Sequence, residues 1–394
     1  MNSKELVKAA LYFEKPERVP YFKDVRGDMI FLILQPSQNW KPGWKDGEEG
    51  LFPHIRTNYE WNKPEWAKNN TKFKKDEWKK MPHEEVDEWG CIWNMTGSDY
   101  TMGHPGRPII EDWKDFDEYR EKYSLDPYDE TRYEFAHELK RAFGKDKYLS
   151  ALLADFGPFQ RSTNIIGFSK FLIEHRKNPQ MVRKILNWVA DWHIDAMKGC
   201  FKYGLDPDGF FIVDDLGEQS GPFFSPKTFK EFYYPIYKKL ADEAHELGTE
   251  IHLHCCGKVD KIMPILIDAG LDAIEFDSPR MTGYNDLRPF RGKIMMWGGV
   301  NIQSIYTRGT PEQVQREVWH MVRNLGTKEG GFGAYFYPTP TDIKAPSKNI
   351  KAFLRGLKKY GDYSKIPEEW WEYPVPQEWK DMEVPPTPPG EIVS

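Results

Sequence analysis

"DGFFIVDDLGEQSGPFFSPKTFKEFYYPIYKKLADEAHELGTEIHLH", residues 208–254, is the stretch that decides the fold. It opens with an apolar run of strand length and closes with a second one. Between them lies a segment with helical character that starts at Ser-Pro and stops at Gly248. A strand, a helix and a strand in this order predict two parallel strands joined by a crossover helix.

The same alternation extends over the chain from about residue 147 onward. Further strand-like runs lie at 147–155, 271–277, 293–299 and 331–338, and helix-like runs at 178–204, 259–270, 310–326 and 346–361. Residues 18–22 add an early strand, and residues 91–95 are ambiguous. No G-x-G-x-x-G sequence follows a strand. We therefore predict an α/β fold, a (β/α)8 TIM barrel, rather than an open doubly wound sheet.

Two segments do not fit the alternation. Residues 36–110 are polar, aromatic and punctuated by proline, and we predict that they form an irregular cap on a single barrel domain spanning residues 1–361. Residues 362–394 are rich in Pro, Trp and Glu, and we predict a tail that packs on the barrel, because exposed Trp side chains would form a large apolar patch. The aromatic rings either fasten these segments to the barrel or form the wall of a pocket.

The composition excludes several classes of protein. Hydrophobic residues make up 39% of the 394 residues and charged residues 29%, with a net charge of −6, which indicates a globular protein without a surface for nucleic acid. No apolar run approaches the roughly 20 residues of a membrane helix. No signal pattern is evident, and four cysteines are too few for a disulfide framework. We expect a cytoplasmic protein that binds neither nucleic acid nor membranes.

Polar side chains gather at the expected carboxyl ends of the strands, which is where the active site of a parallel barrel lies. They are Asp155, Asp214, Asp215, Glu218, His252, His254, Cys256, Glu275, Asp277, Asn301, Gln303, Tyr335, Tyr337 and Asp342. Each carboxylate alone is equally explained by a helix cap or an ion pair. Gathered at one rim with two histidines, they indicate an active site.

Residues 250–260, "EIHLHCCGKVD", allow two interpretations, a metal site or part of the packed barrel interior. Strand alternation places His252 and His254 on the face that points into the barrel. His254 and Cys256 are two residues apart and can both reach one ion, and imidazole with thiolate suits Zn²⁺. Alternatively, both histidines are core residues hydrogen-bonded to carboxylates, and the cysteines are small buried apolar groups.

The chain resembles the uroporphyrinogen decarboxylase superfamily over most of its length. The stretches that carry the resemblance are "KPERVP" (15–20), "DDLGEQSGPFFSPKTFKEFYYPIYKKL" (214–240), "HLHCCGKV" (252–259), "MMWGGVNIQ" (295–303), "RGTPEQVQREV" (308–318) and "GGFGAYFYPTPTDIKAPSKNIKAF" (330–353). The resemblance implies a (β/α)8 barrel with its active site at the carboxyl ends of the strands.

Within the superfamily, the chain is more similar to the corrinoid-dependent methyltransferases than to the decarboxylases. The decarboxylases carry an Arg-Gln-Ala-Gly-Arg-like segment, which "RVPYFKDVRGDMIF" (18–31) lacks. The methyltransferases carry His-x-Cys-Gly at a strand end, which matches His254, Cys256 and Gly257. A second Cys near the last strand completes their zinc site, and "YFYPTPTDI" (335–343) has none.

The resemblance implies a methyltransferase of the O-demethylase type, which takes a methyl group from a small methoxylated, aromatic donor and works with a corrinoid-binding protein. It also allows a homodimer. Zn²⁺ would be held by His254 and Cys256, with Glu218, Asp277 or His252 as third ligand. The catalytic residues would be Asp155, Asp215 and Asp277, and the substrate-binding residues Trp297, Asn301, Tyr335 and Tyr337. The alternatives are a decarboxylase or other lyase that uses the same lumen without metal, and a barrel that serves only for binding.

Overall fold

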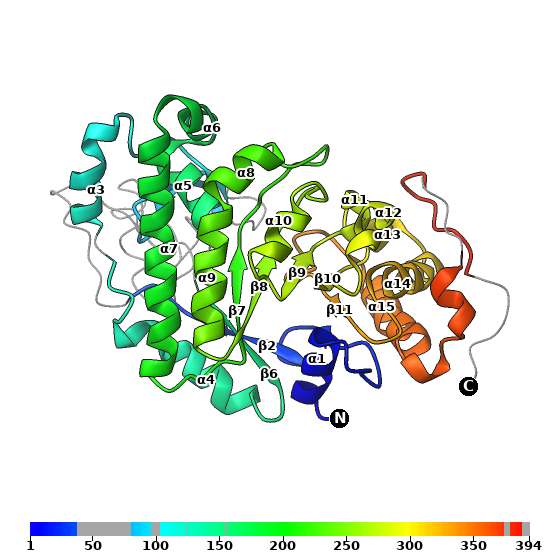
Figure 1. The fold of residues 1–394 in the computed structure, drawn as a ribbon. Helices are drawn as coiled ribbons and strands as arrows, with labels where there is room; N and C mark the ends of the chain where they lie inside the picture. The colour runs from blue at the N-terminus through cyan, green and yellow to red at the C-terminus, as the bar shows by residue number, and fades with distance from the viewer. Residues whose placement is uncertain (38–79, 96–102, 124, 154–155, 374–378, 388–394) are drawn as a thin grey trace. The chain divides into compact units, whose positions relative to one another are not determined.

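Eight parallel strands close into a barrel in the structure, a computed structural model that describes residues 1–37, 80–95, 103–123, 125–153, 156–373 and 379–387 (Figure 1). The chain divides into two compact units. The first comprises residues 1–32, 136–155 and 205–394 and holds the barrel, and the second comprises residues 33–135 and 156–204.

The strands follow the order β1-β11-β10-β9-β8-β7-β6-β2 around the barrel. Their bounds are β1 Tyr21–Phe22, β2 Met29–Ile33, β6 Tyr148–Leu152, β7 Gly209–Val213, β8 Glu250–His254, β9 Ala273–Phe276, β10 Met295–Gly298 and β11 Phe332–Tyr335. The predicted (β/α)8 barrel is therefore confirmed. The strand that the sequence did not reveal is β2, which lies between β1 and β6.

The helices of the first unit are α1 Ser3–Leu11, α4 Glu134–Phe143, α8 Pro226–Phe232, α9 Tyr234–Glu246, α10 Met263–Asp268, α11 Pro279–Thr282, α12 Tyr284–Leu287, α13 Ile305–Arg308, α14 Pro311–Leu325 and α15 Ser347–Tyr360. The helix expected over residues 225–248 is thus two helices, α8 and α9. Pro235 lies in the first turn of α9, where its missing N–H does no harm, whereas a continuous helix would lose a hydrogen bond there.

The barrel interior is filled by side chains from alternate strand positions. Phe22, Met29, Tyr148, Phe211 and Trp297 belong to one buried cluster. Trp297 pairs in register with Gly333, and a side-chain carbon at residue 333 would lie only 2.2 Å from the indole ring. Glycine at this position therefore lets the indole lie in the lumen.

The amino-terminal end of the barrel is closed by a buried carboxylate. Glu250 accepts a hydrogen bond from the Tyr148 hydroxyl at 2.9 Å and pairs with the Lys8 ammonium of α1 at 3.1 Å. His252 lies two residues further along β8, and its Nε2 is 3.0 Å from the Tyr148 hydroxyl. The buried charge of Glu250 thus has its hydrogen-bond and ion-pair partners at this same end of the barrel.

The second unit carries a three-stranded antiparallel sheet, β3 His83–Val86, β4 Ile92–Met95 and β5 His104–Pro105. Of the ambiguous residues 91–95, residues 92–95 therefore belong to this sheet. Its helices are α3 Phe116–Lys122, α5 Pro158–Ile166, α6 Phe168–Lys177 and α7 Pro179–Lys202. Much of the expected cap over residues 36–110 lies outside the described residues, as do residues 374–378 and 388–394 of the expected tail.

Arginine side chains hold the core of this second unit. Arg132 makes two hydrogen bonds of 2.8 Å to the Glu88 carboxylate, and both side chains are almost fully buried. Arg161 pairs with Asp87 through Nη1, and both of these side chains are also almost fully buried. Buried charges need such partners, because an unpaired buried ion is strongly destabilising.

Across the described ranges, no helix is both long and apolar enough to cross a membrane.

His193 on α7 makes the stability of the protein sensitive to mild acid. Burial lowers the pKa of His193 from 6.5 to about 4, so the unfolded chain takes up a proton first as the pH falls. Stability from this residue is complete above pH 6.5 and is lost between pH 6.5 and 4. We expect the free energy of unfolding to lose about 2 kcal/mol from His193 between pH 7 and pH 5.

The measurement is urea unfolding at both pH values for the wild type and for His193→Gln. The wild type should lose more stability than the variant over this interval, by roughly the same 2 kcal/mol. Equal losses in the two proteins would show that His193 is not the group that titrates.

Candidate metal centre and active site

The carboxyl ends of β7, β8 and β9 bring a set of metal-ligating side chains to one rim of the barrel. Val213 pairs in register with His254, and His254 with Glu275, so these three strands end at the same level. Asp215 follows β7 by two residues, Cys256 follows β8 by two residues, and Asp277 follows β9 directly. Parallel register therefore gathers residues that lie up to 62 positions apart in sequence (277 − 215 = 62).

Two groups of side chains in the described residues have ligand atoms within 4.8 Å of one another. The groups are Asp215, His254 and Cys256, and His254, Glu275 and Asp277. His254 Nε2 lies 3.2 Å from Cys256 Sγ and 3.6 Å from Asp215 Oδ1. Cys256 Sγ lies 3.3 Å from Asp277 Oδ2. One imidazole nitrogen, one sulfur and carboxylate oxygens at these separations suit Zn²⁺.

Glu275 fixes the orientation of the His254 ring. Its Oε2 contacts His254 Nδ1, and the Glu275 side chain is fully buried. With Nδ1 as the donor to this carboxylate, Nε2 faces Cys256 and Asp215, where it can offer a lone pair to a metal ion that displaces its proton. Carboxylate–histidine pairs of this kind hold the ligand nitrogen toward a metal.

The backbone at Gly257 holds Cys256 in place. Gly257 has φ +94°, and a side-chain carbon there would lie 2.2 Å from the carbonyl oxygen of Gly217. The loops after β7 and β8 therefore touch backbone to backbone. The Cys256 N–H donates to Asp215 Oδ1 at 2.7 Å, which joins the same two loops a second time.

Burial sets the protonation of this cluster. It raises the pKa of the Cys256 thiol to about 12 and that of the Glu275 carboxyl to about 7, and it raises the pKa of Asp277. Burial opposes protonation of His254, but Cys256 and Glu275 outweigh it and raise the pKa of the imidazole well above its ordinary value. A dication bound by these groups would displace their protons.

Cys255 takes no part in either group. Its side chain is fully buried, its sulfur accepts the Leu216 N–H at 3.2 Å, and its S–H donates to the Cys256 carbonyl at 3.2 Å. The neighbouring cysteines therefore have different surroundings, and only Cys256 faces the cluster.

Several polar residues at the strand ends serve the surrounding structure. Asp214 is fully buried and accepts the Tyr237 hydroxyl at 2.7 Å. Glu218, expected as third ligand, is exposed and accepts a hydrogen bond from Ser220, and neither group in the described residues includes it. Glu218 as a ligand stays a prediction, and Asp155 lies outside the described residues.

The expected substrate-binding residues lie at different depths. Trp297 is fully buried in the barrel-interior cluster. Asn301 donates its backbone N–H to Glu317 and accepts from Gln303 through its side chain. Tyr335 stacks on Phe22 with ring centroids 4.8 Å apart. Contact of these residues with substrate stays a prediction.

Burial and the nearby acidic groups of the cluster raise the pKa values of Tyr335 and Tyr337. Burial, with Glu275 and Asp277 as the next contributions, raises the pKa of Tyr335 well above its ordinary value. Burial, with Asp277 and Cys256, raises the pKa of Tyr337 to about 12. Both phenols therefore stay protonated near neutral pH, as hydrogen-bond donors beside a group of acids.

Glu275 is the residue whose role the sequence did not reveal. It stood among the strand-end carboxylates, but nothing separated it from its neighbours. The signal in the sequence was the alternation of side chains along a strand, which places Glu275 on the same side of the chain as Asp277, two positions later. In the structure, the register pairs Glu275 with His254.

Comparison with known proteins places these features in a wider context. The model of the family described as "Uroporphyrinogen decarboxylase (URO-D)" matches residues 91–359. A "Methylated-thiol--coenzyme M methyltransferase" of Methanosarcina mazei is 23% identical over 207 residues, which are 51% of this chain and 51% of that protein. The chain thus spans about half the length of this curated relative.

The solved structure of a methyltransferase from Methanosarcina mazei is also similar. It has a TM-score of 0.57 and 16% sequence identity, over 91% of this chain and 99% of that one. At this identity the likeness concerns the fold, and it agrees with the closed parallel barrel.

Proposed function

Because the chain belongs to the uroporphyrinogen decarboxylase family, we propose that it is a methyltransferase that takes a methyl group from a small methoxylated, aromatic donor and passes it to a corrinoid carried by a partner protein. The observation that carries the proposal is the set of nitrogen, sulfur and oxygen ligands at the rim of the barrel. The likeness to a methyltransferase over half the chain supports the reaction class.

His254, Cys256 and Asp215 would hold Zn²⁺, since their ligand atoms lie within 4.8 Å of one another. Asp215 replaces Glu218 in this assignment, because Glu218 is exposed and bonded to Ser220. When bound, Zn²⁺ supplies a Lewis acid for the ether oxygen of the donor, which makes the phenolate a better leaving group. A Co(I) corrinoid supplies the nucleophile for the methyl carbon.

The remaining polar groups of the rim would bind the donor and supply a proton or hydrogen bond to its departing oxygen. Asp277 lies 3.3 Å from Cys256 and is placed to give a proton or hydrogen bond to the departing oxygen. Tyr337 carries a phenol that stays protonated near Asp277 and can donate to the same oxygen. Tyr335 and Phe22 form a stacked aromatic pair near this level of the barrel, which suits an aromatic ring.

The direct test uses purified protein with zinc, cob(I)alamin as acceptor and a panel of donors. Methoxylated phenols should convert cob(I)alamin to methylcobalamin, which is followed by absorbance. Transfer from methyl thioethers alone would overturn the donor class, and no transfer from any methylated donor would overturn the activity.

Glu275 gives a more specific prediction within this function. Glu275→Gln keeps the shape of the side chain but removes the charge that orients His254, and we expect zinc affinity to fall about 10- to 100-fold. Zinc affinity is measured by competition with a chromogenic chelator. Glu250→Gln is the matched control, because it removes another buried lumen carboxylate, at the opposite end of β8. An equal loss of affinity in both variants would contradict the role of Glu275.

A further inference from the structure

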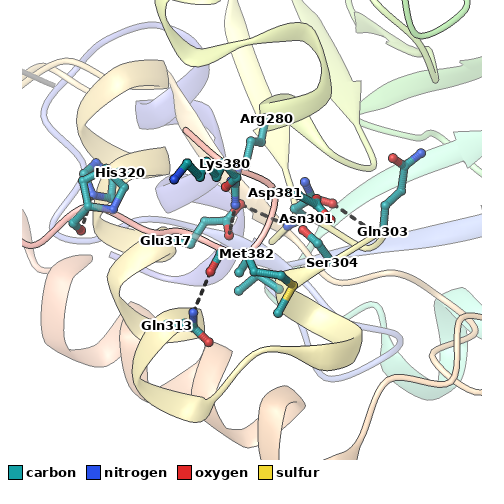
Figure 2. A network of polar contacts seen from close by, with 12 residues as sticks. Arg280, Asn301, Gln303, Ser304, Gln313, Glu317, His320, Lys380, Asp381 and Met382 are labelled. Atoms are coloured by element: carbon teal, nitrogen blue, oxygen red, sulfur yellow. Dashed lines mark hydrogen bonds and ion pairs between the residues drawn. The ribbon is translucent and has the colours of Figure 1, made fainter. Parts of the chain in front are cut away.

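The carbonyl groups of a short carboxy-terminal segment are held by side chains of the first unit. We call residues 379–385 the C-terminal strap. Arg280 Nη2 donates to the Lys380 carbonyl at 2.6 Å, Gln313 Nε2 to the Met382 carbonyl at 2.7 Å, and His320 Nε2 lies 2.9 Å from the Pro385 carbonyl. Figure 2 shows these side chains gathered around the strap. Three bonds to main-chain atoms fix the path of the strap over α14 and α11.

Trp379 anchors the start of the strap. Its ring lies 4.5 Å from that of His320 and 5.3 Å from that of Tyr284, and the Arg280 guanidinium lies over it at 4.9 Å. Aromatic pairs and a cation over an indole each add favourable energy beyond the area they bury. Arg280 is therefore held by the strap at two points, the Trp379 ring and the Lys380 carbonyl.

Glu317 lies beneath Arg280 and joins three segments. The carboxylate is fully buried on α14, and its Oε1 accepts from the Tyr284 hydroxyl and from the Asn301 N–H, both at 3.2 Å. Its Oε2 lies 3.7 Å from Arg280 Nη1. One carboxylate thus links α11, α12 and the loop after β10, and a buried carboxylate needs a nearby cation such as Arg280.

These contacts reach the rim of the barrel by short covalent paths. Arg280 follows Asp277 by three residues, and Asn301 follows the end of β10 by three residues. We propose that Arg280 and Glu317 are positioning residues that hold the loops carrying Asp277 and Asn301, and that the C-terminal strap keeps Arg280 in place. The proposal rests on the proposed function for the role of Asp277, but the attachment of the loops stands on the contacts themselves.

The test compares three full-length variants. Trp379→Ala removes the ring that covers Arg280, and Trp379→Phe restores an aromatic ring. Trp370→Ala is the matched control, because Trp370 is another tail residue that contacts α14: its ring lies 5.8 Å from that of Trp319, and its carbonyl accepts a hydrogen bond from Arg323. Hydrogen–deuterium exchange is measured on peptides covering residues 277–284 and 299–306, and methyl transfer by methylcobalamin formation, with zinc affinity by competition to show that the metal site is intact.

We expect Trp379→Ala to speed exchange in both loops about tenfold and to lower the rate of methyl transfer, with zinc affinity unchanged and Trp379→Phe close to the wild type. Trp370→Ala should leave exchange and methyl transfer unchanged. Unchanged exchange in Trp379→Ala, or an equal increase in Trp370→Ala, would overturn the claim that the C-terminal strap holds Arg280 and the two loops in place. Faster exchange with an unchanged rate of methyl transfer would overturn the positioning role. A wild type that transfers no methyl group would refute the proposed function, and the exchange data would still decide whether the strap holds the loops.

Discussion

Cys256→Ser is expected to lower zinc content to well under one ion per chain and to reduce methyl transfer at least 100-fold. A serine hydroxyl is a poor substitute for a thiolate, and Cys256 Sγ lies within 3.3 Å of both His254 and Asp277. Zinc is measured by mass spectrometry after dialysis, and transfer by methylcobalamin formation. In the wild type, zinc binding should weaken below neutral pH, because protons compete for the imidazole and the thiolate.

The neighbouring residue supplies the control. Cys255→Ser should keep zinc and activity, since Cys255 is a hydrogen-bond partner of Leu216 and Cys256 and serine can make the same bonds. Wild-type protein that transfers methyl groups at full rate while holding little zinc would contradict the metal assignment. His254 would then act as a residue of the barrel interior, and the acid role would fall to a carboxylate.

Gly257→Ala is expected to destabilise the protein by about 3 kcal/mol or more and to abolish tight zinc binding. Two effects would destabilise the alanine variant: the backbone angle φ of +94°, and a side-chain carbon placed 2.2 Å from the Gly217 carbonyl oxygen. Left-handed backbone alone costs about 1–2 kcal/mol for a residue with a side chain, and relieving the contact would push apart the loops that bear Asp215 and Cys256. Urea unfolding and zinc competition measure the two effects.

Gly248→Ala separates the two causes. Gly248 also has positive φ, +75°, but a side-chain carbon there would meet nothing within 4 Å. Its cost should therefore stay near the backbone cost of about 1–2 kcal/mol, with zinc binding intact. If Gly257→Ala behaves like Gly248→Ala, the close approach of the two loops is not what holds the site together.

The sequence by itself determined the barrel and the level of the site. Repeated strand and helix runs from residue 147 predicted parallel strands, because strand periodicity and helix periodicity are local properties. Alternation along β8 placed His252 and His254 in the lumen, since successive side chains of a strand point to opposite faces. The rule that parallel barrels act at the carboxyl ends of their strands then selected Asp215, Cys256 and Asp277.

Only the tertiary structure decided which of these side chains meet. Glu218 was expected as a third metal ligand, yet the chain turns back after Gly217, where the Glu218 N–H bonds to the Gly221 carbonyl, and the side chain is exposed. Glu275 drew no special notice, yet the register of β8 and β9 sets it against His254. The physical reason is range: periodicity fixes the face on which a side chain lies, whereas contact between strands depends on register and on backbone turns that distant residues such as Gly217 and Gly257 impose on one another.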